Sequence, residues 1–563
     1  PVETVVSERR PVPLYQHVFA GRRLFSLYAG LDSGEAASSG LDSDKVTLSE
    51  AASGEPTSSG PAAALAPAPA IVNPELLQLA RQEARRLRDD SRRPRGHNGR
   101  GKKHVSYGSG AFGGAANARF ASYSRLAPRR GDVVAELDRR QLLPAIYFVF
   151  SRLGCDQAVH RLVEEDLCLT SGPERRALRD LADEAAAGLN DDDRAALRFD
   201  DWREALSRGL AAHHAGLLPV FKQAVEQAFT AGLAKVVFAT ETLALGINMP
   251  ARTVVLEKLV KYNGQSHADI TPGEYTQLTG RAGRRGIDVE GHAVVAWQPG
   301  LDPRALAGLA SRRTYPLRSA FNPTANMAVN LVGSLGADRA RGLLDRSFAQ
   351  FHADRCQGQA ARSRALAERF DKVAGVLENL GYFACDEPDG PWRVTEAGRG
   401  LARLYGEQDL VVAEALRARI FDGLAVAPLA AVLSALVYES RQRDRRQPPA
   451  LLPDRSSQRA VAELRRLARD IAVLERGRGL PPRPLLDIGF AEAAYHWADG
   501  ASLGEVLRLA DVTAGDFVRW IRQITDLAGQ IADADRSSPL ATSCRRLVAS
   551  LCRGVVDTAD PDD

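Results

Sequence analysis

Glycines and arginines alternate in one short segment whose composition suits the binding of a large anion. These residues are Gly280, Arg281, Gly283, Arg284, Arg285 and Gly286. Glycines let the backbone approach a ligand closely. Arginines three positions apart lie on one side of a helical turn, so Arg281 and Arg284 can present two guanidinium forks to one triphosphate-sized anion. The same pattern also fits a glycine-rich loop whose arginines pair with surface acids, so the residues upstream must decide between the two.

Polar residues follow two strongly apolar runs, at positions where ligands often bind. The run that ends at Phe150 is followed by Ser151 and Arg152, and the run that ends at Ala239 is followed by Thr240 and Glu241. Such runs are typical of strands in a parallel sheet that is covered on both faces. Open α/β sheets bind ligands at the carboxyl ends of their strands, where we expect these four side chains.

Four apolar segments are expected to form the sheet, with helices between them. The segments are residues 142–150, 235–240, 252–260 and 291–297. Helical periodicity over residues 151–162 and 220–233 alternates with them and predicts an α/β fold with a parallel sheet. From residue 301 onward the pattern is mostly helical, with a hairpin expected at 381–394 and long helices over 403–563.

The composition excludes some classes of protein and leaves others open. Apolar residues make up 45% of the 563 residues and charged residues 26%, and the net charge of +4 is too small to name a partner. No run approaches the ~20 apolar residues of a transmembrane helix, and the first residues do not have the pattern of a secretory signal. The six cysteines form no CxxC pair, which predicts reduced thiols in a cytoplasmic protein and no metal site.

Two segments before residue 140 have the composition of linkers. Residues 31–70 are rich in Gly, Ser, Ala and Pro, and residues 85–103 are strongly basic. The basic run fits either an arm on nucleic acid phosphates or a linker that is kept in solution by its charge. Residues 1–29 alternate like the end of a folded domain, and the chain starts with Pro1, so we expect a C-terminal fragment of a longer protein.

In order and spacing, several segments resemble the second RecA-like domain of superfamily-two helicases. They are AIYFVFSR, HHAGLLP, VVFATETLALGINMPARTVV and QLTGRAGRRG. More narrowly, they resemble the superkiller-type (antiviral) DExH-box RNA helicases in a bacterial form. YPLRSAFNPTANMAVNLV and RSFAQFHADR are similar to that family's winged-helix region, and LAAVLSALVYESR and TAGDFVRWIRQITDLAGQIA to its C-terminal helical domain. VVSERRPVPLYQHVF is similar to the exit strand of its first RecA-like domain.

The resemblance implies a RecA-like parallel sheet domain followed by winged-helix and all-α domains. The implied segments are the end of a truncated first RecA-like domain (1–29), a low-complexity and basic linker (30–140), the second RecA-like domain (141–300), the winged-helix region (301–375) and the C-terminal helical domain (376–563).

The resemblance also implies roles for individual residues on the nucleotide side. Arg281 and Arg284 match the two arginine fingers that stabilise charge on the γ-phosphate during phosphoryl transfer. Gln277 matches the residue that couples the nucleotide to the facing domain. Gly246 and Asn248 match positions that contact ATP or its bridging network, and Gly280 belongs to the same nucleotide-facing motif. The implied cofactors are ATP and Mg²⁺.

On the nucleic acid side, the resemblance implies contacts from the strand ends and from the helical domain. Ser151, Arg152, Thr240 and Glu241 match its strand-end contacts, and Arg519 is a candidate because the family's helical domain lines the channel for the strand. The alternative for Arg519 and its neighbour Trp520 is packing. For the aromatic residues Phe321, Phe348 and Phe351 we expect core packing of at least two rather than base stacking.

The sequence also departs from the family pattern. It contains neither GxxxxGK[ST] nor a DExH after an apolar strand, and the joint at 352–380 is too short for an arch-like insertion. The phosphate cradle and the magnesium carboxylate would belong to a missing first RecA-like domain, so this chain alone is expected to be inactive. We therefore expect part of an ATP-dependent helicase that acts on single-stranded RNA, with DNA as the alternative strand. We expect RNA-decay machinery as its protein partner and no association with a membrane. The alternatives are a non-hydrolysing nucleic-acid-binding module and a DNA repair helicase.

Overall fold

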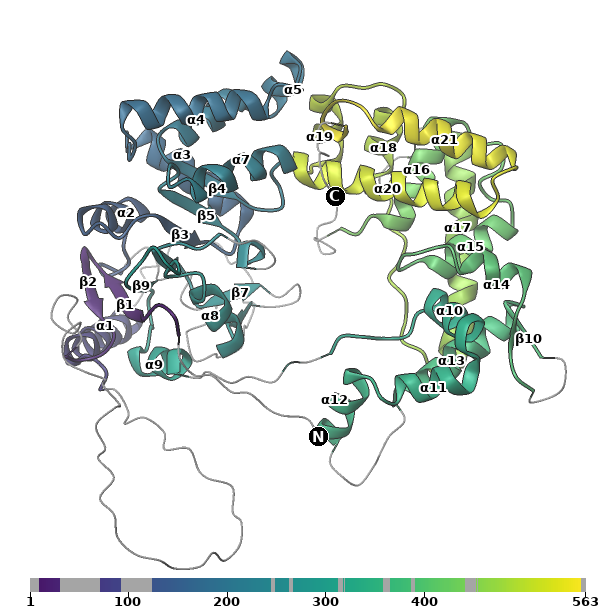
Figure 1. The fold of residues 1–563 in the computed structure, drawn as a ribbon, viewed down its shortest axis with the longest axis horizontal. Helices are drawn as coiled ribbons and strands as arrows, with labels where there is room; N and C mark the ends of the chain where they lie inside the picture. The colour runs from purple at the N-terminus through teal and green to yellow at the C-terminus, as the bar shows by residue number, and fades with distance from the viewer. Residues whose placement is uncertain are drawn as a thin grey trace, which may run out of the picture. The chain divides into compact units, whose positions relative to one another are not determined.

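The computed structural model divides into two compact units (Figure 1). The first comprises Pro1–Arg179, Glu204–His214 and Val225–Tyr315, and the second comprises Asp180–Arg203, Ala215–Ala224 and Pro316–Asp563. The residues that the structure describes are 10–30, 71–92, 124–244, 249–262, 267–311, 317, 319–357, 365–385, 390–440, 452 and 454–557.

A seven-stranded sheet forms the core of the first unit, in the order β2-β1-β9-β6-β3-β5-β4. Neighbouring strands are parallel except for β2, which is antiparallel to β1. The inner strands are buried along their whole length because nearly all their side chains are apolar. This confirms the expected α/β fold with a parallel sheet. The strands are β1 Leu14–Ala20, β2 Arg23–Ser26, β3 Ala145–Phe148, β4 Leu210–His213, β5 Val236–Ala239, β6 Thr253–Leu256 and β9 Gly291–Ala296.

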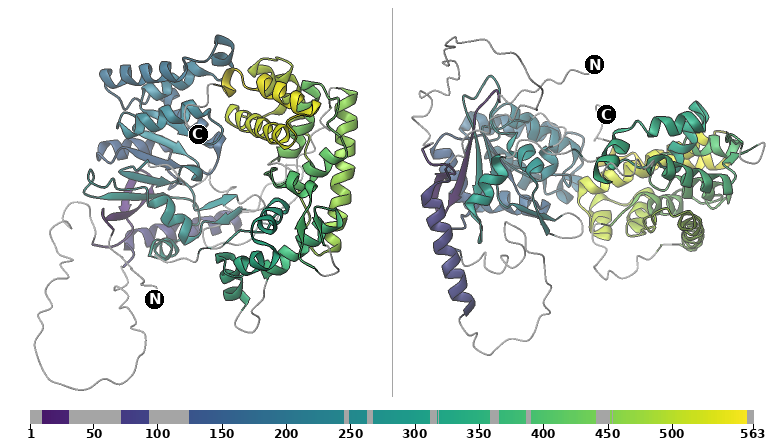
Figure 2. Two further views of the ribbon diagram at one scale, coloured as in Figure 1. Left: turned by 45° about the vertical axis from the view of Figure 1, so that its right-hand side comes forward. Right: turned by 90° about the horizontal axis from the view of Figure 1, so that it is seen from below.

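Helices flank this sheet, as Figure 2 shows. The helices expected at 151–162 and 220–233 are confirmed as α3 and α7, and α7 buries Phe221, Val225 and Phe229 on one stripe. The helices between residues 74 and 311 are α1 Pro74–Arg92, α2 Arg130–Arg139, α3 Arg152–Glu164, α4 Gly172–Ala185, α5 Asp191–Ala196, α6 Phe199–Ser207, α7 Pro219–Thr230, α8 Pro272–Thr279 and α9 Pro303–Ser311. Of these, α5 belongs to the second unit.

The strand β1 lies inside this sheet, which corrects the assignment of residues 1–29 to a preceding domain. β1 pairs in parallel with β9 over Leu14–Phe19, and Val18 and Phe19 are 0% exposed. Strand β2 then turns back along β1 and forms the edge of the sheet. The alternation of residues 14–26 predicts a strand but not its partner, because pairing with β9 joins residues far apart in the chain.

Two further strand predictions needed correction. The segment 252–260 is not one strand, because β6 ends at Leu256 and β7 (Val260–Tyr262) forms a separate hairpin with β8 (His267–Asp269). Strand β4 was not predicted at all, since its sequence, LAAH, is short and weakly apolar. Its position at the end of the sheet beside β5 follows from tertiary pairing.

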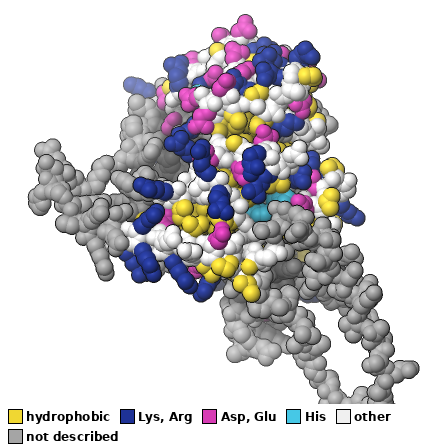
Figure 3. Space-filling model, turned by 90° about the vertical axis from the view of Figure 1, so that its left-hand side faces the viewer, with side chains coloured by type: hydrophobic (Ala, Val, Ile, Leu, Met, Phe, Trp, Pro, Cys, Tyr) yellow, Lys and Arg dark blue, Asp and Glu magenta, His cyan; other side chains and the backbone are white. Residues whose placement is uncertain are grey.

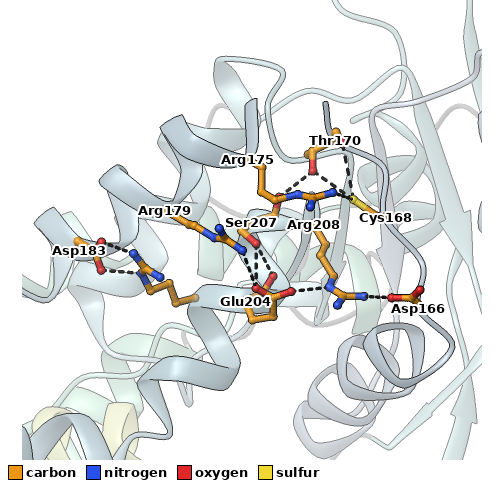
Figure 4. Close-up of polar contacts among 10 residues, drawn as sticks. Asp166, Cys168, Thr170, Arg175, Arg179, Asp183, Glu204, Ser207 and Arg208 are labelled. Atoms are coloured by element: carbon orange, nitrogen blue, oxygen red, sulfur yellow. Dashed lines mark hydrogen bonds and ion pairs between the residues drawn. The ribbon is translucent and has the colours of Figure 1, made fainter. Parts of the chain in front are cut away.

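Ion pairs between helices hold one side of the first unit together (Figure 4). Glu204 accepts hydrogen bonds from Arg179 Nη2 at 3.1 Å and from Arg208 Nε at 2.8 Å. Arg208 also donates to Asp166 at 2.8 Å. The pKa of Glu204 is lowered mainly by its hydrogen bond with Arg208. Arginines in this part of the fold therefore act as ion-pair partners for neighbouring acids.

The second unit is mostly helical, as expected after residue 301, and the hairpin predicted at 381–394 is present as β10 and β11. Its elements are α10 Ala325–Leu335, α11 Ala337–Leu344, α12 Phe348–Gln357, α13 Ala365–Asn379, β10 Phe383–Ala384, β11 Arg393–Val394, α14 Glu396–Leu401, α15 Asp409–Arg417, α16 Val426–Val437, α17 Arg455–Gly477, α18 Ala491–Ala498, α19 Leu503–Ala510, α20 Ala514–Ala534 and α21 Pro539–Leu551.

The boundary expected at residue 375 falls inside α13 and is corrected by the packing around α10. Helix α10 packs against α11, α13 and β11. The buried Asn326 on α10 donates from Nδ2 to the carbonyl oxygens of Leu401 and Leu404 at 3.1 and 2.7 Å. Residues on both sides of position 375 thus form one cluster of helices with a small hairpin.

Helix α16 is the core of the C-terminal bundle. Ten of its twelve residues are buried, and it packs against α17, α18, α20 and α21. A helix that is apolar all round is typical of the interior of a larger bundle. Within the described ranges, we find no helix with both the length and the apolar character needed to span a membrane.

Candidate functional site

The segment with the glycines and arginines forms a turn after helix α8, which we call the arginine turn (280–286). Thr271 accepts a hydrogen bond from the Glu274 backbone N–H, and Glu274 accepts one from the Thr271 N–H at 2.6 Å. Pro272 occupies the first helical position. This capping box fixes where α8 begins. Its TPGE sequence is a local signal that could have predicted the start of the helix. The helix ends at Gly280, where a Cβ would lie 2.8 Å from the carbonyl oxygen of Thr276.

The arginine turn lies at the amino-terminal edge of strands β6 and β9. Ala251, just before β6, forms a bridge with Ala282, and the Gly283 N–H donates to the carbonyl oxygen of Ala251 at 2.7 Å. Gly283 has φ +86°, and a Cβ there would lie 2.7 Å from Val12 Cγ1. A side chain cannot be accommodated at Gly283 without displacing its neighbours, so glycine lets the turn sit tightly on the sheet.

Arg284 is held by an acid of the same turn. Its Nε and Nη2 donate to Asp288 Oδ2 and Oδ1, both at 2.8 Å, and its side chain is 21% exposed. The hydrogen bond with Asp288 raises the pKa of Arg284. A guanidinium has five N–H donors, so this pair leaves three of them for another anion. The pair orients Arg284 but also offsets its charge.

Arg281 reaches away from the turn to a backbone oxygen. Its Nη2 donates to the carbonyl oxygen of Ala244, the last residue of the 3₁₀ helix Glu241–Ala244. Burial lowers the pKa of Arg281. Arg281 and Arg284 therefore leave the same turn, but each has its own partner in the protein, whereas the sequence predicts two forks on a shared face.

The other residues expected on the nucleotide side divide into two groups. Gln277 lies on α8 and is exposed, as is Gly280. Gly246 and Asn248 lie outside the described residues. Gln277 and Gly280 thus belong to the same helix end as the arginine turn.

Ser151, Arg152 and Thr240 lie together at the carboxyl edge of the sheet, as the sequence predicts. Strands β3 and β5 are neighbours, with Phe148 paired to Ala239, so the residues that follow them meet at one edge. The Ser151 hydroxyl accepts from the Gly154 N–H at 3.1 Å and caps α3, where Arg152 is the first residue. Thr240 Oγ1 lies 2.9 Å from Thr242 Oγ1. A hydroxyl, a guanidinium and a helix N-terminus at one edge suit the binding of a phosphate.

The carboxylate of Glu241, which the sequence predicts at the same strand end, is engaged in an ion pair within the protein. Its carboxylate accepts two hydrogen bonds from Lys261 Nζ at 2.9 and 2.8 Å. Lys261 also pairs with Glu274 Oε1 at 2.6 Å and is 16% exposed. Burial lowers the pKa of Lys261, but the hydrogen bonds with both acids outweigh it and raise the pKa overall. Glu241 therefore serves as an acceptor that ties the strand end to β7 and α8.

The two groups of residues lie at opposite edges of one sheet and are joined by the segment 240–251. Thr240 follows the carboxyl end of β5, and Ala251 precedes the amino end of β6. Between them, Glu241 contacts Lys261 and the carbonyl group of Ala244 contacts Arg281. One segment thus connects the carboxyl edge of the sheet with the arginine turn.

Arg519 in the second unit lies on α20 beside a cavity. Its guanidinium carbon is 4.3 Å from the centre of the Trp520 ring, and it pairs with Asp516 at 3.2 Å. The cavity, of about 340 Å³, is lined by Trp520, Tyr438 and parts of α15 and α16. Arg519 thus stacks on Trp520, and the ring of Trp520 is the part of this pair that lines the cavity.

The expectation that at least two of three phenylalanines pack in the core is wrong. Phe321, Phe348 and Phe351 are 39%, 50% and 53% exposed. Phe348 and Phe351 lie one turn apart on α12, with ring centres 6.1 Å apart. Their helical spacing suggested burial, but the described residues do not cover this face of α12.

Comparison with family models places two matches on this chain. The model described as helicase conserved C-terminal domain matches residues 196–286, and the model described as DSHCT (NUC185) domain matches residues 392–559. The first match includes the arginine turn and Thr240, and the second includes Arg519.

Known proteins resemble the chain over different lengths. The probable helicase HelY of Mycobacterium tuberculosis is 33% identical over 98% of this chain and 79% of its own length. Human superkiller complex protein 2 is 38% identical over 44% of this chain and 19% of its own length. Mouse exosome RNA helicase MTR4 is 34% identical over 43% of this chain and 23% of its own length. The HelY alignment runs over 771 positions, more than the 563 residues here, so HelY has internal segments that this chain lacks.

Proposed function

The chain belongs to the superkiller-type family of superfamily-two helicases, and on that basis we propose that it provides the second RecA-like domain and the helical domain of an ATP-dependent RNA helicase. One observation carries this proposal. The segment 240–251 links a phosphate-binding edge at Thr240 to the arginine turn through the contact of Arg281 with Ala244. Such a link is what an enzyme needs if nucleotide hydrolysis is to change its hold on a strand.

The arginine turn fits only part of an ATP site. When bound, ATP supplies the phosphoryl group whose transfer drives the cycle. Arg281 and Arg284 would stabilise the charge that develops on it, with Asp288 holding the Arg284 fork in place. The described residues contain no group of three or more His, Cys, Asp or Glu side chains that could hold a metal ion. We therefore assign no Mg²⁺ ligand to this chain.

The strand would run along the carboxyl edge of the sheet. Arg152 and the N-terminus of α3 attract a backbone phosphate, and the Thr240 hydroxyl donates to it. The hairpin of β7 and β8 starts at the same edge, because Lys261 ties it to Glu241, and it exposes Tyr262 by 56%. An exposed ring at this point can stack on a base where a duplex opens.

We propose RNA as the substrate, with RNA processing or decay in the cytoplasm as the setting. The support comes from relatives that are named for the superkiller complex and as an exosome RNA helicase. Contacts with the backbone alone read no base, so the strand would be bound with little sequence preference. A DNA helicase and a binding module without hydrolysis are the outcomes against which this proposal is tested.

The test is a titration of the chain with labelled oligouridine and oligothymidine at several salt concentrations. Three or four phosphate contacts from the strand-end track would give log K a slope of about −2 to −3 against log salt. Arg152→Ala with Thr240→Ala should remove about one ionic contact and weaken binding roughly fivefold at ~0.1 M salt. Arg161→Ala with Thr230→Ala is the matched control on the same unit.

Three results would count against the proposal. A double variant that matches the parent at every salt concentration would remove the strand-end contacts. Tighter binding of the DNA oligonucleotide would favour a DNA helicase. In the complete natural protein, Arg284→Lys should lower turnover ~10³-fold and leave RNA affinity nearly unchanged, because lysine lacks the planar fork. Unchanged turnover would favour the binding module.

A further inference from the structure

Helix α1 is firmly docked on the first unit. The Asn73 N–H donates to the carbonyl oxygen of Leu27 at 2.9 Å, and Leu76 is fully buried. Glu83, in the middle of the helix, is 7% exposed and accepts a hydrogen bond from Trp297 Nε1 at 2.8 Å. A buried carboxylate that meets an indole N–H fixes the rotation of the helix about its axis. The opposite face of α1 is therefore turned outward in a defined way.

The outward face carries exposed arginines, which we call the arginine ridge (Arg81, Arg85 and Arg86). Arg81 and Arg85 lie one helical turn apart, and all three are exposed. Between Leu76 and Arg88 the single acid is Glu83, which faces inward. Figure 3 shows this side of the unit, with basic side chains along its lower part, where α1 lies in Figure 1. The ridge is thus a strip of positive charge.

Some exposed arginines in the described part of the chain are paired, and those of the ridge are not. The side chains of Arg139, Arg161 and Arg198 are 66%, 65% and 71% exposed, and each pairs with an acid on its own helix or at its start. Among the residues that the structure describes, no ion pair or hydrogen bond involves the side chain of Arg81, Arg85 or Arg86. No described side chain therefore holds the three guanidinium groups of the ridge, although Asp89 and Asp90 follow it in the sequence of α1.

We infer that the arginine ridge is a second phosphate-binding surface for the RNA strand, outside the strand-end contacts. The inference rests on the proposed nucleic acid substrate. Guanidinium groups along a helix match the regular charges of a nucleic acid backbone. An anionic membrane also attracts arginines, but helices that lie on membranes insert an apolar face. The apolar face of α1 is already packed against the protein, which favours nucleic acid as the partner.

The position of α1 in the fold allows one strand to reach both sites. Trp297, which holds Glu83, follows the carboxyl end of β9, and Thr240 follows the carboxyl end of β5. In the sheet order these two strands are separated by β6 and β3, so their ends are three strand spacings, or roughly 14 Å, apart. Both anchor points lie at the same edge of the same sheet, and the ridge lies farther out, on the face of α1 opposite Glu83.

The ridge overlaps the start of the basic run at 85–103. Residues 85–103 fit either a basic arm or a solvated linker, and residues 85–92 of that run are the last turns of α1. The remaining residues of the run lie outside the described part of the chain. The inference therefore rests on the docked helix and not on the rest of the basic run.

The test compares the salt dependence of oligouridine binding by the chain and by Arg81→Gln with Arg85→Gln and Arg86→Gln. Each lost contact with a single strand lowers the slope of log K by about 0.7, so three contacts contribute about two units. With the ridge engaged, we expect a slope of about −4 to −5 for the parent and −2 to −3 for the triple variant. Affinity at ~0.1 M salt should fall at least tenfold.

A matched variant controls for net charge. Arg139→Gln with Arg161→Gln and Arg198→Gln removes the same charge from paired positions and should leave the slope unchanged. Equal slopes for the parent and the ridge variant would overturn the inference, while strand-end variants that still weaken binding would leave the proposed function standing. A parent that binds no RNA would overturn both. Binding of phosphatidylserine vesicles that the ridge variant abolishes, with RNA binding intact, would assign the ridge to membranes.

Discussion

At the scale of single residues, nearby acids decide which cations remain available for a ligand. Asp288 takes two N–H groups of Arg284, and Glu241 and Glu274 occupy Lys261. The residue types alone do not predict these contacts, because surface acids and cations occur throughout the sequence and any of them could form a pair. They divide the cations of the first unit into those that hold elements together and those that can meet phosphate.

Lys261 is the clearest case of a cation that holds elements together. Replacing it with methionine leaves Glu241 and Glu274 without their shared partner in a partly buried site. We expect a loss of about 1–3 kcal/mol and a melting temperature lowered by several degrees, seen by differential scanning calorimetry. Lys258→Met, at an exposed position on the same segment, should melt with the parent. Equal melting of both variants would show that the ion pairs contribute nothing.

A buried histidine pair should make the sheet sensitive to acid. His17 on β1 lies 3.1 Å from His292 on β9, between Nε2 and Nδ1, and burial lowers the pKa of His17 to about 3. The unfolded chain takes up a proton below pH ~6.5, whereas the folded chain does not. Stability is therefore complete above pH ~6.5 and falls as the pH decreases towards 3, by at most ~1.4 kcal/mol per pH unit for this group.

The measurement is the melting temperature between pH 7 and pH 5. Glu136 and Glu174 titrate below this window, since their pKa is lowered to about 2 by hydrogen bonds with Arg139 and Lys235. His17→Gln should flatten the loss of stability in this range. His160→Gln, at a side chain that is 60% exposed, should not. A parent with a flat profile would contradict the prediction.

At the scale of elements, the arginine turn depends on two glycines with positive φ. Gly283 and Gly286 have φ of +86° and +78°, but a Cβ would meet Val12 at the first and nothing within 4 Å at the second. Both positions are strained by a side chain, by about 1–2 kcal/mol. The first alone also fastens the turn to the segment that leads into β1.

These two glycines provide a matched pair of variants. Gly286→Ala should cost only the backbone strain of about 1–2 kcal/mol. Gly283→Ala should cost more, because its methyl group must displace Val12 and move the turn away from β6 and β9. Chemical denaturation monitored by tryptophan fluorescence would compare them. Equal destabilisation would mean that the packing of the turn against Val12 is loose.

At the scale of the whole molecule, the chain combines a match to the helicase C-terminal domain with a match to the DSHCT domain. Its family matches cover residues 196–286 and 392–559, and HelY has internal segments that the chain lacks. We predict that one of these HelY segments is an arch-like insertion at the position that corresponds to residues 352–380 of this chain. The 563 residues contain arginines for an anion but no loop of the GxxxxGK[ST] type.

We therefore expect the chain of 563 residues to hydrolyse no measurable ATP, with or without RNA. Arginines that lack a phosphate cradle and a Mg²⁺ site have lost most of the contacts that bind and activate ATP. A phosphate-release assay with oligouridine tests this, with Arg284→Ala as the background. RNA-stimulated turnover that disappears in Arg284→Ala would contradict the prediction and show that another part of the chain binds the nucleotide.

The sequence by itself determined the elements whose signals are local. Fully apolar runs predicted the strands at 145–148 and 236–239, and helical periodicity predicted α3 and α7. These features depend on residues close together in the chain, where periodicity and propensity act directly. The family resemblance could be seen for the same reason, since its motifs are short and contiguous.

Only the tertiary structure decided which distant residues meet. It placed β1 beside β9 in the sheet, turned Glu83 of α1 towards Trp297, and paired Glu241 with Lys261. Each of these contacts joins segments that are separated by 20 or more residues. Strand register and ion pairing over such separations depend on how the whole sheet assembles, and a local pattern carries no information about it.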